Sequence, residues 1–137
     1  MPSRSAEALL FNPNPEAYLP HRRPFLLLDR IVALQRGETA TAVISVTGGT
    51  RHFPDVLLIE ALAQLGGIAA GHEEGEGGFL AAIDRATFIG SASAGDLLEV
   101  TVRVVKSFGR LHLLEGEVSA EGRVLATAGF TLGMGRI

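Results

Sequence analysis

One apolar segment dominates the hydrophobic pattern of this chain. Between Pro54 and Ala70, after Asp55, the only polar side chains are Glu60 and Gln64. These two lie four positions apart, so they share one face of a helix. A helix that is apolar on its other faces has to be buried, and an ionisable carboxyl there is costly unless it is paired or protonated. The pattern therefore predicts a buried helix over this segment, with Glu60 as the leading candidate for a functional group.

Shorter apolar runs on either side have the length of strands. The run from Phe25 to Leu34 and the alternating run from Thr39 to Val46 flank a turn at Gly37, which predicts a hairpin. Four later runs are separated by short glycine-containing turns, which predicts an antiparallel meander over residues 79–88, 97–107, 111–120 and 123–133. One helix among five to six antiparallel strands is typical of an α+β domain whose sheet curls around that helix.

Two further features concern the surroundings of the long helix. Residues 5–11 could form a short helix within an N-terminal flap over residues 1–17. Gly66 and Gly67 lie inside the long helix, where glycine costs about 1 kcal/mol relative to alanine. Paired glycines there predict that another backbone comes very close, either from the enclosing sheet or from a second subunit.

Composition and charge narrow the class of protein. The chain has 137 residues without linkers or repeats, so we expect a single domain over 1–137. Its net charge of −3 argues against a general nucleic-acid binder, and its lack of cysteine excludes a thiol nucleophile. No spacing of metal ligands occurs, so we expect no metal. Without a signal-like N-terminus or a membrane-length apolar run, we expect a soluble protein in the cytoplasm and no membrane partner.

Two long motifs carry a resemblance to a known family. Residues 19–30 read LPHRRPFLLLDR, and residues 53–64 read FPDVLLIEALAQ. Both are similar to segments of the hotdog-fold (3R)-hydroxyacyl-[acyl carrier protein] dehydratases, and weaker matches extend the resemblance from residue 18 to about 133. It implies a hotdog fold, in which an antiparallel sheet of five to six strands wraps around one long central helix. It also implies a homodimer or a higher homo-oligomer.

The resemblance implies the dehydration of a 3-hydroxyacyl thioester carried by acyl carrier protein or coenzyme A, without a cofactor or metal. In the family, a histidine takes a proton from C2 and a carboxylic acid protonates the departing hydroxyl. Glu60 would be the acid, because an apolar setting disfavours its ionised form, and Gln64 would orient it. Backbone N–H groups of Val56 and Leu57, at the start of the helix, would bind the thioester oxygen.

The segment before the helix departs from the family pattern. The loop that carries the catalytic histidine is shorter here, and His52 matches that histidine only if the following turn is deleted. We therefore expect His52 to be either the base or an ordinary loop residue. Asp55 stands where the family has glycine. As a helix N-cap, its carboxylate would place negative charge near the oxyanion position and weaken dehydratase chemistry.

Three functions stay open on the sequence alone. A dehydratase would use Glu60 with His52, a thioesterase would use Glu60 to activate water, and a non-catalytic protein would bind acyl thioesters without either reaction. Several basic residues could attract an acidic carrier protein, although scattered surface charge explains them as well; they are Arg22, Arg23, Arg103, Lys106 and Arg110. The histidines His21, His72 and His112 are expected to be structural or surface groups.

Overall fold

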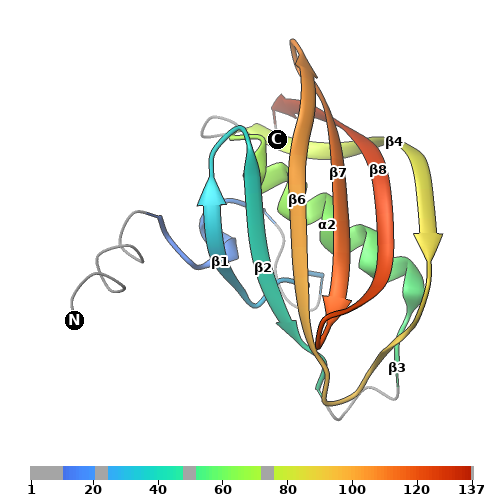
Figure 1. The fold of residues 1–137 in the computed structure, drawn as a ribbon. Helices are drawn as coiled ribbons and strands as arrows, with labels where there is room; N and C mark the ends of the chain where they lie inside the picture. Colours follow the sequence, from blue (N-terminus) through green and yellow to red (C-terminus); the bar gives the residue numbers. More distant parts are fainter. Residues whose placement is uncertain (1–10, 21–24, 48–51, 72–75, 137) are drawn as a thin grey trace.

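The computed structural model describes residues 11–20, 25–47, 52–71 and 76–136. In them, a six-stranded antiparallel sheet with the order β1-β2-β6-β7-β8-β4 curls around one α-helix (Figure 1). This arrangement confirms the α+β class predicted from the hydrophobic pattern. The elements are η1 (Pro15–Ala17), β1 (Arg30–Gln35), β2 (Thr39–Ser45), β3 (His52–Phe53), α2 (Asp55–Ala69), β4 (Glu76–Phe88), β5 (Ala92–Ser93), β6 (Leu97–Phe108), β7 (Leu111–Ala120) and β8 (Arg123–Arg136).

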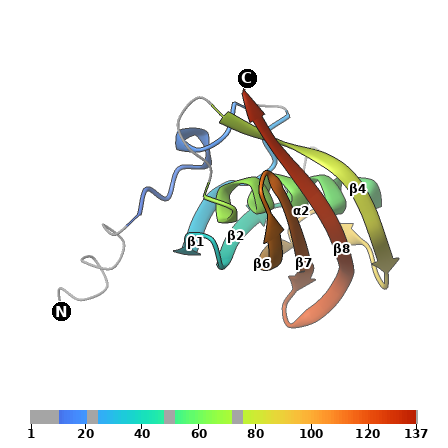
Figure 2. The same cartoon turned by 90° about the horizontal axis from the view of Figure 1, so that it is seen from above.

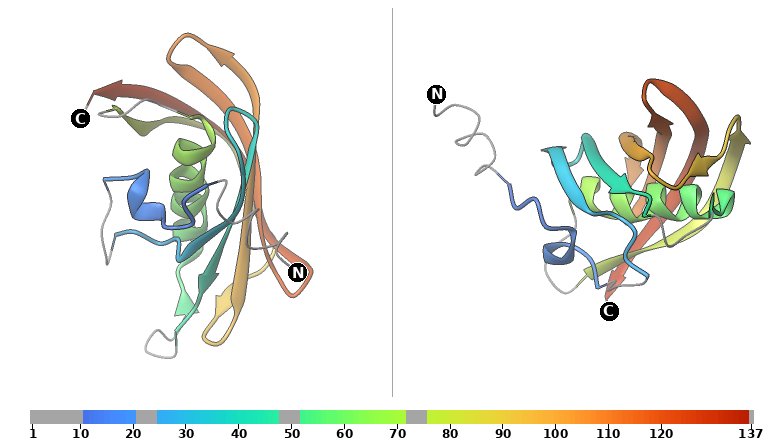
Figure 3. Two further views of the ribbon diagram at one scale, coloured as in Figure 1. Left: turned by 90° about the vertical axis from the view of Figure 1, so that its left-hand side faces the viewer. Right: turned by 90° about the horizontal axis from the view of Figure 1, so that it is seen from below.

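The predicted central helix is α2, and it is buried as its composition requires. The sheet curves around it (Figure 2), and the segment containing η1 lies on the side of the helix away from the sheet (Figure 3). Leu58, Leu62 and Leu65 are fully buried, and each leucine stabilises the fold by roughly 1.5–3 kcal/mol through the apolar surface it removes from water. Across the described ranges, no helix is long and apolar enough to cross a membrane.

Strand neighbours differ in part from the predicted meander. β6, β7 and β8 pair in sequence order, as expected. β4, however, pairs with β8 at the sheet edge, and β2 occupies the position beside β6. The prediction was wrong on this point because alternation identifies a strand and its buried face but does not say which strand lies next to it.

The N-terminal boundary of the first strand is also later than predicted. β1 begins at Arg30, while the residues before it run alongside α2 and β2. The N–H of Leu27 donates to Gln64 Oε1 at 3.0 Å, and the N–H of Ser45 donates to the Asp29 carboxylate at 2.6 Å. Side chains therefore supply part of the hydrogen bonding that a strand partner would supply. The short helix predicted over 5–11 lies almost wholly outside the described residues.

The enclosing sheet lies close to both glycines of the pair in α2. A Cβ atom built on Gly66 would lie 3.0 Å from Leu132 Cδ1 and 3.1 Å from Phe130 Cε2, so side chains rather than a backbone come close there. At Gly67 the predicted backbone approach is present, because a Cβ atom built on Gly78 of β4 would lie 3.7 Å from Gly67 Cα. The enclosing sheet, one of the two predicted neighbours, therefore lies close to Gly67.

Candidate active site

Glu60 and Gln64 are joined by a hydrogen bond one turn apart on α2. Gln64 Nε2 donates to Glu60 Oε2 at 2.9 Å, which confirms that the two side chains share a helix face. Gln64 is buried, with 2% of its surface exposed, while Glu60 is half-buried. The carboxyl thus lies at the boundary between the helix core and accessible space.

The Gln64 amide is held in one orientation by the backbone of the N-terminal segment. Its Nε2 donates to the carbonyl oxygen of Phe25 at 2.8 Å, and its Oε1 accepts from the N–H of Leu27 at 3.0 Å. A carbonyl oxygen can only accept and a backbone N–H can only donate, so the amide cannot be reversed without losing both bonds. Gln64 therefore presents an N–H to Glu60, which suits the orienting role expected of it.

A cavity of about 160 Å³ opens beside this pair. Its walls come from α2, from the start of β4, from β8 and from the segment after η1. Apart from Glu60 and Gln64, every lining residue is apolar or a glycine: Leu19, Pro20, Ala63, Gly67, Gly78, Phe79, Leu80 and Leu132. The cavity therefore offers an apolar chain a place to lie, with one carboxyl at its wall.

Two expectations about the helix start are wrong. Pro54 is the N-cap and makes no side-chain capping bond, and Asp55 is the first helical residue. Proline's fixed φ fits that position, at φ −55° and ψ 135°. In addition, the N–H of Leu57 already donates to the carbonyl oxygen of Pro54 at 2.9 Å, so Leu57 does not offer a free donor. Val56, which is 69% exposed, stays the candidate donor at this end of the helix.

The position of the His52 ring stays untested. The backbone of His52 pairs with Ser93 in the two-stranded β3–β5 ribbon just before α2, but its side chain lies outside the described residues. Two-residue strands have no periodic signal, so the sequence did not reveal this ribbon. The residues His21, Arg22, Arg23 and His72 also fall outside the described ranges.

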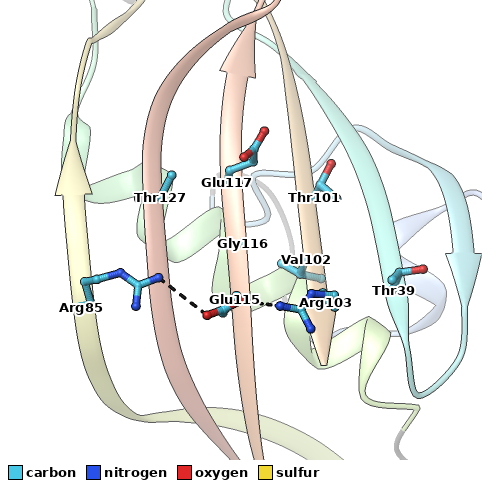
Figure 4. A pocket seen from close by; sticks show the side chains of 9 residues that line it. All are labelled: Thr39, Arg85, Thr101, Val102, Arg103, Glu115, Gly116, Glu117 and Thr127. Carbon is cyan, nitrogen blue, oxygen red and sulfur yellow. Dashed lines mark hydrogen bonds and ion pairs between the residues drawn. The ribbon is translucent and has the colours of Figure 1, made fainter. Parts of the chain in front are cut away.

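A larger hollow of about 420 Å³ lies on the face of the sheet away from α2 (Figure 4). Arg85 and Arg103 approach the Glu115 carboxylate from either side. The Nη2 atom of Arg85 lies 3.9 Å from Glu115 Oε2, and that of Arg103 lies 2.5 Å from Oε1; all three side chains are well exposed. Lys106 Nζ lies 4.8 Å from the centroid of the Phe108 ring. Because Arg103 and Lys106 have partners within the chain, these contacts favour ordinary surface charge over a carrier-binding patch.

His112 is half-buried and hydrogen-bonds a neighbouring side chain, which fits the structural role expected of it. Its Nδ1 lies 2.8 Å from the Ser107 hydroxyl oxygen near the end of the β6–β7 hairpin, and its register partner on β8 is Leu132. Partial burial lowers the pKa of His112 below its usual value of about 6.5.

Known proteins share both the sequence and the fold. The family model for the FabA-like domain matches residues 19–129. The 3-hydroxyacyl-[acyl-carrier-protein] dehydratase FabZ of Oceanobacillus iheyensis is 37% identical over 126 residues, which cover 82% of this chain and 90% of that protein. The Bacillus subtilis dehydratase of the same name is 32% identical over 130 residues, which cover 85% of this chain and 92% of that protein.

Among solved structures, the dehydratase heterocomplex ApeI:P from Xenorhabdus doucetiae superposes with a TM-score of 0.81. The match has 20% sequence identity and covers 92% of this chain and 93% of that one, so it bears on the fold alone. Together with the sheet wrapped around α2, this similarity identifies the hotdog fold. The match over residues 19–129 shows that the chain belongs to the FabA-like domain family.

Proposed function

We propose that this protein is a dehydratase that removes water from 3-hydroxyacyl thioesters, carried by acyl carrier protein or coenzyme A, in fatty-acid-type metabolism. The observation that carries the proposal is the Glu60 carboxyl, which Gln64 orients at the wall of an otherwise apolar cavity. The relatives named as 3-hydroxyacyl-[acyl-carrier-protein] dehydratases support the same reaction.

In the proposed reaction, a base removes a proton from C2 of the substrate, and His52 is the candidate for that base. The electrons of the C2–H bond form the C2–C3 double bond while the C3–O bond breaks. Glu60 donates a proton to the departing hydroxyl, which leaves as water. The proton taken by the base returns to Glu60 before the next cycle. Negative charge that develops on the thioester oxygen is stabilised at the start of α2, where Val56 is the candidate donor.

Gln64 decides which oxygen of Glu60 carries the transferable proton. Since the Gln64 amide presents an N–H to Oε2, that oxygen accepts a hydrogen bond. A proton on the carboxyl is then better placed on Oε1. The fixed amide thus favours one orientation of the Glu60 carboxyl, which reduces the reorganisation needed when the substrate binds.

We further propose that two copies associate through β4. This strand is the edge of the six-stranded sheet, so one of its sides has no strand neighbour in the described part of the chain. Large apolar side chains are exposed along it and just after it: Phe79, Leu80, Ile83, Phe88 and Ile89. An exposed apolar edge strand favours pairing with another strand, and an antiparallel β4–β4 pair would cover it in both copies. Such a dimer would also cover the β4 side of the Glu60 cavity.

The reaction can be tested with crotonyl and 3-hydroxybutyryl thioesters of coenzyme A and of acyl carrier protein. Interconversion of the two acyl groups, followed by chromatography, is the expected result. Release of free thiol without interconversion would instead identify a thioesterase. Saturable binding with neither reaction would identify a non-catalytic binding protein. Either of the last two outcomes would overturn the proposal.

A further inference from the structure

The two adjacent glycines of α2 differ in what the fold requires of them. At Gly66, an added Cβ atom would lie 3.0 to 3.2 Å from the side chains of Leu132, Phe130 and Leu114, so core packing demands glycine. A Cβ atom added at Gly67 would have one described neighbour within 4 Å, which is Leu19 Cδ2 at 3.6 Å. That is an ordinary van der Waals contact. Alanine would therefore fit at Gly67 and would stabilise the helix by about 1 kcal/mol.

The space that Gly67 leaves open belongs to the Glu60 cavity. Gly67 lines this cavity together with Glu60 and Gln64, on the same face of α2. At about 1.5 Å per residue, it lies about 10 Å further along the helix axis than Glu60. Gly78 on β4 lines the facing wall, and a Cβ atom there would be 3.7 Å from Gly67 Cα. The cavity is therefore narrow at this end, and its walls there carry no polar side chain.

We infer that Gly67 is a specificity-determining residue that keeps the end of the cavity open for the tail of a medium-length acyl chain. This inference rests on the proposed function, because it places the C3 hydroxyl of the substrate at Glu60. A 3-hydroxybutyryl group has only a methyl group beyond C3, which stays near Glu60. A 3-hydroxydecanoyl group has a heptyl tail, which extends along α2 toward Gly67. The glycine thus costs helix stability and preserves room for that tail.

The test compares the wild-type protein with Gly67→Ala and Gly135→Ala. Both variants add one methyl group, but only Gly67→Ala adds it to the cavity wall, because Gly135 does not line the cavity and a Cβ atom there has no described neighbour within 4 Å. The dissociation constants of saturated butyryl- and decanoyl-coenzyme A are measured by calorimetry, because these thioesters have no 3-hydroxyl and cannot be dehydrated. Gly67→Ala should raise the melting temperature and weaken decanoyl binding relative to butyryl binding by about ten-fold. Gly135→Ala should leave the ratio of the two constants as in the wild type.

An unchanged ratio in Gly67→Ala, or an equal change in both variants, would overturn the inference. The binding measurement does not depend on turnover, so its outcome is separate from that of the proposed reaction. If wild-type protein binds decanoyl-coenzyme A with the predicted dependence on Gly67 yet interconverts no 3-hydroxyacyl thioester, the proposed reaction fails and the assignment of Gly67 stands.

Discussion

The substitution Gln64→Glu tests whether the Gln64 amide orients the candidate acid, Glu60. It makes almost no change in side-chain volume. The new carboxyl can still accept from the N–H of Leu27, but in its ionised form it cannot donate. In the wild type, Gln64 Nε2 donates to the carbonyl oxygen of Phe25 at 2.8 Å and to the Glu60 carboxyl at 2.9 Å. In the variant, an ionised carboxyl would face both of these acceptors. The variant loses two hydrogen bonds, each worth about 1–2 kcal/mol, and places a second negative charge beside Glu60. Its free energy of unfolding at pH 8 should therefore be lower than that of the wild type by roughly 2–4 kcal/mol.

The cost should depend on pH in a defined direction. Two adjacent carboxyls in the folded state hold a proton more tightly than they do in the unfolded chain. The folded state therefore binds more protons above about pH 4.3, and the variant's stability should fall as the pH rises through that region. Urea unfolding of the wild type and of Gln64→Glu at pH 5 and pH 8 measures this difference. The exposed Gln35, changed to Glu, is the matched control, and we expect little effect there. Equal unfolding free energies for Gln64→Glu and the wild type at both pH values would refute the orienting role of Gln64.

The start of α2, the β4 edge and the β6–β7 hairpin each respond to a single substitution or to pH in a defined direction. Asp55→Asn removes a negative charge from the first turn of α2, so kcat/KM for dehydration should rise about two- to five-fold, as expected for a charge effect of 0.3–1 kcal/mol; an unchanged or lower value would count against the oxyanion site at this helix end. Ile83→Lys places a charge on the exposed β4 edge and should shift the protein from dimer to monomer in analytical ultracentrifugation, whereas an unaltered dimer would place the interface elsewhere. His112 has a lowered pKa, so it favours the folded state above about pH 6.5, and that contribution should be lost as the pH falls through its folded value; an NMR titration that gives a pKa at or above 6.5 would contradict this.

Elements with a strong local pattern were predictable from the sequence. The apolar run with Glu60 and Gln64 gave the central helix to within one residue at each end, and β7 spans the predicted residues. In both cases the residues that decide the structure are close together in the chain. The hydrogen bond between Glu60 and Gln64 also follows from helix geometry, because side chains four residues apart are neighbours.

The rest of the site depends on groups without a sequence signal. The amide of Gln64 is held by the backbone carbonyl of Phe25 and the backbone N–H of Leu27, and every residue type but proline provides both groups. The loss of Leu57 as a donor has a similar origin, since the first turn of α2 uses its N–H to bond Pro54. The place of β4 at the sheet edge likewise depends on pairing between distant segments.

The role of Glu60 as the proton donor is tested most directly by the rate of dehydration of a 3-hydroxyacyl thioester by Glu60→Gln. Glutamine keeps the size of the side chain and can still accept from Gln64, but it cannot donate a transferable proton. Circular dichroism and the melting temperature verify that the variant is folded. We predict that kcat falls by about 10²- to 10⁴-fold relative to the wild type. A folded variant that dehydrates the substrate at the wild-type rate would contradict the role assigned to Glu60.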